Sequence, residues 1–214
     1  MAESFAERHD FDRGYGPSTG RLLRLVREGG DWRTLAREPF DGAGSWGNGA
    51  AMRVAPLGAW FADAPAEAAR QAALSAEVTH PHPEAVAGAI AVAVAASIAP
   101  TEPPPGKFID EVLRHVPDGA VRKGIVEARR LLTIGDPSTA AAVLGNGRQV
   151  AAHDTVPFTV WAAARHLGDF KRAFWTTAAA GGDIDTTCAI VGGIIGKAPA
   201  DWLGHYEPLP GWAL

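Results

Sequence analysis

The sequence predicts an all-α protein that folds as one compact domain over residues 1–214. Three observations support this class. Apolar residues recur with helical spacing along almost the whole chain, alternating strand patterns never exceed about four residues, and no low-complexity linker divides the chain. A chain of 214 residues is long enough to bury one substantial core, and its composition of 47% apolar and 21% charged residues is ordinary for a globular protein.

The composition excludes several classes of function. The formal net charge of -4 argues against broad nucleic-acid binding, because phosphate backbones are bound by clustered Lys and Arg side chains. A membrane-spanning helix needs about 20 apolar residues, and the longest such stretch, residues 85–99, is shorter and is better interpreted as a buried helix. The N-terminus has no apolar signal-peptide core. Cys188 is the only cysteine, so no internal disulfide can form and a cytoplasmic protein is expected.

The expected helices follow one another with short breaks. A short amphipathic element lies around residues 22–35, and an Ala-rich helix is expected over 65–79. Residues 84–99 are small and apolar on nearly every face, which predicts a buried helix that its neighbours approach closely. After a rigid break at residues 103–105, helical patterns resume at 107–116, 119–133, 137–144, 157–167, 169–180 and 184–197.

The sharpest chemical pattern is Gly-Gly-Asp-Ile-Asp-Thr-Thr at residues 181–187, directly before an apolar run. The paired glycines permit a tight turn into a helix. At such an entry the carboxylates of Asp183 and Asp185 and the hydroxyl of Thr186 can converge, and this all-oxygen set suits a hard cation such as Mg2+. The alternative is that Asp183 or Asp185 caps the helix and complements its dipole. The spacing alone leaves both interpretations open.

A second glycine-rich segment spans residues 40–53 and contains a G-x-G-x-x-G string at 42–47. A dinucleotide-binding fold is not predicted, because no strand precedes the string and no βαβ pattern follows it. The glycines can instead bring backbone N–H groups close to an anion such as a pyrophosphate. Phe40 and Trp46 can stack on a base, and Asn48 can cap the next helix or bind a ligand. A long interhelical turn is the alternative.

Three further features have simple structural interpretations. The string His-Pro-His-Pro-Glu at 80–84 can be a metal cluster, but its prolines favour a stiff lead-in to the following helix. Cys188 lies among apolar helical residues, which predicts a packed thiol rather than a nucleophile. Asp154 or Thr155, placed before Pro157, predicts an N-cap next to a helix-opening proline.

Five segments, taken together and in order, resemble the ADP-ribosylglycohydrolase family. They are DRGYG at 12–16, GSWGNGAAMRVAP at 44–56, VTHPHP at 78–83, TVPF at 155–158 and GGDIDTT at 181–187. The resemblance covers nearly the whole chain. It implies an all-α orthogonal helical bundle that hydrolyses the glycosidic bond between ADP-ribose and a modified acceptor, with ADP-ribose or an ADP-ribosylated protein as its partner.

The resemblance also implies a set of site residues. Asp183, Asp185 and Thr186 would bind magnesium, and the two aspartates would be the catalytic carboxylates that act on the attacking water. The loop 43–49 would wrap the diphosphate and ribose, Phe40 or Trp46 would lie near the adenine, and His80 would face the ligand. The full ligand-binding set is Phe40, Ala43, Gly44, Ser45, Trp46, Gly47, Asn48, Gly49, His80 and Val150.

The sequence departs from the family pattern at its N-terminus. In the family, a helical segment with a Thr-Asp-Asp motif supplies the other ligands of a two-ion magnesium centre, and this sequence lacks that motif. Asp10 and Asp12 do not match it, so the second ion is not provided for. Three explanations stay open. The sequence is an N-terminally truncated form of a normal enzyme, which is favoured because the other motifs are intact, or it is a catalytically impaired ADP-ribose-binding homologue or scaffold. The third is that an oligomer or a complementing chain covers the exposed core. The acceptor is not determined.

Overall fold

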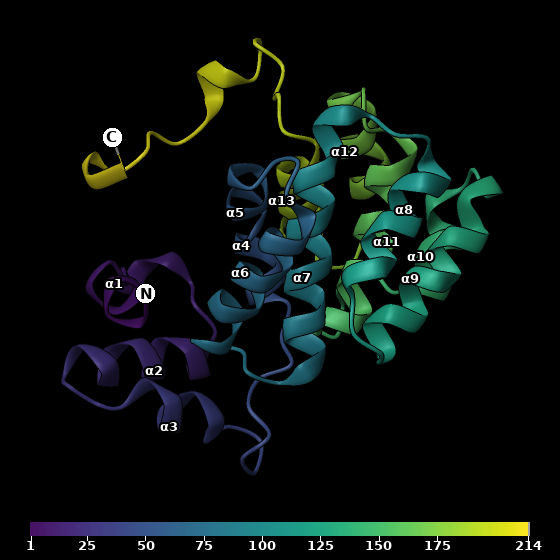
Figure 1. The fold of residues 1–214 in the computed structure, drawn as a ribbon. Helices are drawn as coiled ribbons and strands as arrows, with labels where there is room; N and C mark the ends of the chain where they lie inside the picture. Colours follow the sequence, from purple (N-terminus) through teal and green to yellow (C-terminus); the bar gives the residue numbers. More distant parts are fainter. Residues whose placement is uncertain (214) are drawn as a thin grey trace.

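The computed structural model describes residues 1–213 and confirms the all-α class, with thirteen α-helices and no strand in that range. The helices are α1 (Ala2–Glu7), α2 (Pro17–Arg27), α3 (Trp32–Arg37), α4 (Gly49–Arg53), α5 (Ala55–Trp60), α6 (Pro65–Glu77), α7 (Pro83–Ile98), α8 (Pro105–His115), α9 (Ala120–Arg130), α10 (Pro137–Leu144), α11 (Ala152–Arg165), α12 (Phe170–Ala179) and α13 (Ile184–Ile195). Figure 1 shows helices α4 to α13 gathered into one bundle. The expected helices from residue 65 onward are all present, whereas the short helices α1, α4 and α5 were not predicted.

Helix α7 is the centre of the bundle. Twelve of its sixteen residues are buried, as its small apolar side chains predict. By length and composition, residues 83–101 would suffice to span a membrane, but 78% of their most apolar window is buried inside the fold. The crossing with α5 is close, because a Cβ atom added to Gly58 would lie 2.2 Å from the carbonyl oxygen of Ala93. The prediction of a buried core helix is confirmed.

Helix α11 begins five residues earlier than expected, and the interpretation of Pro157 as its opening residue was wrong. Pro157 lies inside the helix, and Asp154 and Thr155 lie in its first turn rather than at an N-cap. A proline inside a helix removes one backbone hydrogen bond. Here its ring packs closely on α9, since a Cβ atom added to Gly124 would lie 2.4 Å from the Cγ atom of Pro157. Tertiary packing therefore outweighs the local preference.

Residues 1–37 form a small unit beside the main bundle (Figure 1). Helices α1, α2 and α3 pack mainly on one another and bury a separate apolar cluster that includes Leu22, Leu23 and Val26. The C-terminal segment after α13 reaches back to this unit, where Arg13 donates to both carboxylate oxygens of Glu207 at 2.7 and 2.6 Å. The expected single amphipathic element around 22–35 is thus two helices joined by a turn.

Candidate active site

Three segments that are far apart in the sequence meet at one site. They are the glycine-rich loop (residues 40–48), the central loop (residues 145–151) and the carboxylate turn (residues 181–183). The central loop lies between the other two. The N–H of Asn48 donates to the carbonyl of Val150 at 3.1 Å, and the N–H of Asp183 donates to the carbonyl of Asn146 at 3.0 Å. The backbone therefore joins the two motifs that the sequence singled out separately.

Two glycines make this junction possible. A Cβ atom added to Gly147 would lie 2.6 Å from the Cβ atom of Asp183, and one added to Gly182 would lie 2.2 Å from the carbonyl oxygen of Asn146. Both glycines also have positive φ angles, 86° and 81°, which L-residues with side chains rarely adopt. Only glycine fits at either position without moving the carboxylate turn.

The carboxylate of Asp183 does not cap α13. Asp183 occupies the N-cap position without a side-chain capping hydrogen bond, and it accepts a hydrogen bond from the Asn48 side-chain amide at 3.0 Å. Burial raises the pKa of Asp183, and contact with the Asp185 carboxyl raises it further, whereas hydrogen bonds from Asn48 and Thr186 lower it. The same contact with Asp183 lowers the pKa of Asp185. The two carboxyl groups thus lie together at the start of the helix.

Thr186 completes an oxygen-only group. Its hydroxyl is buried and has two acceptors in reach, the Asp183 carboxylate and the Met52 sulfur at 3.6 Å; it can donate to only one of them at a time, and its oxygen lone pairs stay available. Two carboxylates and a hydroxyl are the donor set that a hard divalent cation prefers. Residues 1–213 contain no group of three or more His, Cys, Asp or Glu side chains arranged to hold a metal ion. A cation held by these three donors would take its remaining ligands from water or substrate oxygens.

The glycine-rich loop wraps closely around His80 and Pro81. A Cβ atom added to Gly49 would lie 3.0 Å from the Nε2 atom of His80, and one added to Gly44 would lie 2.5 Å from the Cγ atom of Pro81. The glycines therefore serve close packing, a use that the sequence did not indicate. Some of the loop's N–H groups also have acceptors within the protein, namely those of Ala43, Gly44, Gly47 and Asn48.

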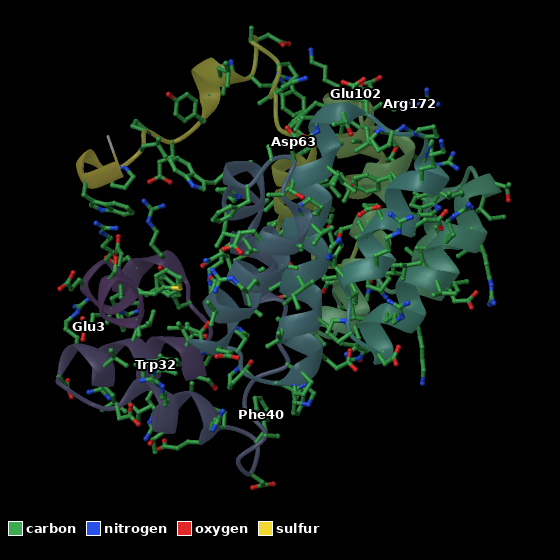
Figure 2. The ribbon with its side chains drawn as sticks, viewed as in Figure 1. Glu3, Trp32, Phe40, Asp63, Glu102 and Arg172 are labelled. Atoms are coloured by element: carbon green, nitrogen blue, oxygen red, sulfur yellow. The ribbon has the colours of Figure 1, made fainter. Side chains whose placement is uncertain are left out.

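An aromatic pair lies at the outer edge of this loop. The ring centroids of Phe40 and Trp46 are 4.2 Å apart, and the two residues are 50% and 36% exposed. Figure 2 shows Phe40 at the far end of the loop. Its φ angle of 59° is rare for a residue with a side chain and marks local strain of the kind found at ligand-binding positions. Both rings are accessible to a flat ligand, as base stacking would require.

The two histidines of the 80–84 string do not form a metal cluster. The Nδ1 atom of His82 accepts the N–H of Glu84 at 3.1 Å and caps α7, so the interpretation as a helix lead-in is confirmed. His80 is buried and pairs with the hydroxyl of Thr79 at 2.7 Å. Burial and, to a smaller extent, the charge of Arg53 lower the pKa of His80 to about 4, so its ring is neutral at pH 7.

Sequence reasoning missed the residues that connect the segments. The Asn48 amide donates to the hydroxyl of Thr155 at 3.1 Å as well as to Asp183, so it is a bridge and not a helix cap. The carboxylate of Asp154 accepts the N–H of Gln149 at 2.8 Å and holds the central loop. The family resemblance had already placed Val150 of this loop in the ligand-binding set, and the Gly-Asn-Gly string at 145–147 is a strong turn signal.

An apolar groove runs along α13 from the carboxylates. It measures about 900 Å³, and its lining includes Asp185, Cys188, Gly192, Phe174 and Trp202. Burial, together with the charge of Asp185, raises the pKa of the Cys188 thiol to about 11. A thiol with that pKa is protonated at pH 7, in agreement with the expectation that Cys188 is not a nucleophile.

Comparison with known proteins identifies the family. The ADP-ribosylglycohydrolase family model matches residues 1–206, nearly the whole chain. The chain therefore belongs to the ADP-ribosylglycohydrolase family. The resemblance found in the five sequence segments is confirmed, and so is the helical fold that it implies.

Its relatives include vertebrate and archaeal proteins. ADP-ribosylhydrolase ARH3 of Gallus gallus is 29% identical to the chain, in a match that covers 99% of this chain and 65% of that protein. ARH3 of Homo sapiens is also 29% identical, with coverages of 94% and 66%. An uncharacterized protein of Archaeoglobus fulgidus is 32% identical, with coverages of 94% and 67%. The chain thus spans about two thirds of the length of the relatives it matches.

Proposed function

We propose that this protein hydrolyses the glycosidic bond between ADP-ribose and a modified acceptor. One observation carries the proposal: the Asn48 amide donates to the carboxylate of Asp183 and so joins the glycine-rich loop to the carboxylate pair. A loop suited to a diphosphate and a base therefore lies next to the groups that would act on the distal ribose. Membership of the family and the similarity to the ARH3 proteins support this class of reaction.

We propose that Mg2+ binds at Asp183, Asp185 and Thr186. When bound there, a divalent ion would neutralise developing charge on oxygen and lower the pKa of a bound water. The contact between the two carboxyl groups supports this assignment, because a cation relieves their mutual repulsion.

The residues of the chain have distinct roles in this proposal. The carboxylate of Asp183 or Asp185 orients the attacking water and accepts its proton, while Asn48 holds Asp183 in place. Water adds to the anomeric carbon as the bond to the acceptor breaks through an oxocarbenium-like state; the departing acceptor takes up a proton from solvent, and the carboxylate later releases to solvent the proton that it accepted from the water. Phe40 and Trp46 hold the adenine, and His80 with the free N–H groups of loop 43–49 contacts the diphosphate and ribose. Val150 lines the same site from the central loop.

A second candidate is an ADP-ribose-binding homologue with little or no activity. It is favoured because residues 1–213 contain no cluster of three or more His, Cys, Asp or Glu side chains that could hold a metal ion. Binding and turnover distinguish the two functions. We place the protein in the cytoplasm for either function, since Cys188 leaves it without a disulfide.

The test combines calorimetric titration of ADP-ribose, with and without Mg2+, and release of ADP-ribose from modified proteins carrying arginine or serine linkages. An active hydrolase binds ADP-ribose and releases it from one of these substrates, and Asp183→Asn abolishes the release. Asp63→Asn is the matched control, because Asp63 is exposed, has a positive φ angle that Asn tolerates, and lies far from Phe40 in Figure 2. Binding without release from any substrate supports the second candidate. No heat of binding at millimolar ADP-ribose contradicts both.

A further inference from the structure

A largely buried arginine lies at the end of α4, the helix that follows the glycine-rich loop. Arg53 ends α4, and its guanidinium donates to the carbonyl of Ser75 at 2.8 Å and to the hydroxyl of Thr79 at 2.9 Å. No carboxylate within residues 1–213 forms an ion pair with it, and its Nε atom is buried without a hydrogen-bond partner there. Burial lowers the pKa of Arg53 to about 10, so the side chain keeps its charge at pH 7. A buried charge without a counterion is costly and calls for a role.

The hydroxyl of Thr79 accepts a hydrogen bond from Arg53 and still has its own proton to donate. An arginine can only donate, so the Thr79 oxygen is the acceptor in that contact. The one acceptor within residues 1–213 for the hydroxyl's own proton is the Nδ1 atom of His80, at 2.7 Å. Donation from Thr79 to His80 gives the buried hydroxyl proton a partner, whereas donation from Nδ1 to Thr79 would leave that proton unpaired within the described residues, so the first direction is favoured.

The hydrogen bond from Thr79 sets the tautomer of His80. With Nδ1 as an acceptor, the single proton of the neutral ring lies on Nε2. No hydrogen bond within residues 1–213 uses Nε2, which lies 3.0 Å from the position of a Cβ atom added to Gly49. The side chain is 6% exposed, so the ring is held by its surroundings and presents one N–H to the glycine-rich loop.

We propose that Arg53 and Thr79 are positioning residues that fix His80 as an Nε2–H donor to an oxygen of the ligand in the glycine-rich loop. Neither residue would touch the ligand. The identity of that ligand, ADP-ribose, rests on the proposed function, whereas the tautomer of His80 does not. A donor of fixed direction suits a diphosphate or ribose oxygen, because its hydrogen bond needs no rearrangement when the ligand arrives.

The first test is the ring nitrogen spectrum of His80. In protein labelled with 15N-histidine, long-range proton–nitrogen correlations distinguish a protonated from an unprotonated ring nitrogen, and the His80→Gln spectrum assigns the signals. We expect protonated Nε2 and unprotonated Nδ1 in the wild-type protein without ligand. Protonated Nδ1 would overturn the proposal; the tautomer is read from the wild-type protein, and the variant serves only to assign the His80 signals.

The second test removes the hydrogen-bond chain from Arg53 through Thr79 to His80 and then restores it. Thr79→Val and Arg53→Met should give a mixture of tautomers and weaken ADP-ribose binding roughly tenfold, the effect of one hydrogen bond to a charged acceptor. Thr79→Ser keeps the hydroxyl and should restore both signals and affinity. Equal spectra and affinities for Thr79→Val and Thr79→Ser would contradict a role for the Thr79 hydroxyl in setting the His80 tautomer. If the wild-type protein shows the expected tautomer but does not bind ADP-ribose, the proposed function fails. The inference that Thr79 sets the tautomer of His80 then still holds.

Discussion

The two halves of the site differ in how completely the chain builds them. On the glycine-rich side, His80 is buried, its Nδ1 atom has a partner, and Arg53 and Thr79 support it from behind. On the carboxylate side, the carboxyl groups of Asp183 and Asp185 contact each other, and an open groove continues along α13. The glycine-rich side is thus supported by several contacts within residues 1–213, whereas the carboxylate side borders an open groove.

The largest expected effect breaks the junction between the halves. Gly182→Ala should lower the free energy of unfolding by about 3 kcal/mol or more, because it adds a steric overlap with Asn146 to the strain of a positive φ angle. Gly181→Ala is the matched control: its φ angle is also positive, at 66°, but an added Cβ atom would meet nothing within 4 Å. Its loss should be about 1–2 kcal/mol. Equal losses in urea denaturation would contradict the junction.

Acid should weaken the glycine-rich side through His80. The pKa of His80 is lowered from 6.5 to about 4. Between these two pH values the His80 ring is protonated in the unfolded chain and neutral in the folded chain. This contribution to stability is fully present above pH 6.5 and is lost as the pH falls towards 4, by up to about 3 kcal/mol. Urea denaturation of wild type and His80→Gln across this range should show their difference changing with pH. A difference independent of pH would contradict the burial of a neutral ring.

Loss of the bridge between the halves should affect turnover more than binding. Asn48→Ala removes the hydrogen bond that orients Asp183, and changes of this kind next to metal ligands reduce activity or metal affinity about 10–100-fold. Gln149→Ala, at an exposed position of the central loop, is the control and should have little effect. Measured rates of ADP-ribose release test this prediction, and an unchanged rate for Asn48→Ala would show that Asp183 needs no such support.

The smallest expected effect concerns the aromatic pair. Trp46→Ala should weaken ADP-ribose binding by about 1–2 kcal/mol, the lower part of the range for a base stacked on an aromatic ring, and should change stability little. Trp60→Ala provides the control, because that tryptophan is 84% exposed and lies outside the aromatic pair. Equal affinities for the two variants would place the adenine elsewhere.

Much of the fold could be predicted from the sequence, because helical periodicity and burial have the same cause. The apolar faces of α7 and α13 indicated helices, and the prediction failed where a tertiary contact overrode a local preference, as at Pro157. The site motifs were also visible in the sequence, although their proposed roles stay predictions. The junction was not visible, since the Asn48–Asp183 contact joins residues 135 positions apart. Local patterns carry no information about such a pairing.

The separate packing of residues 1–37 means that this unit and the main bundle should unfold as two separate cooperative units. Helices α1 to α3 bury their own small cluster, so they can open with less free energy than the main bundle and would exchange their amide protons sooner. Phe5 of this unit lies over the guanidinium of Arg53, with the Arg53 Cζ atom 5.0 Å from the ring centroid. Opening of residues 1–37 would therefore admit water to Arg53, so a fluctuation at the edge of the molecule would loosen the support behind the glycine-rich loop.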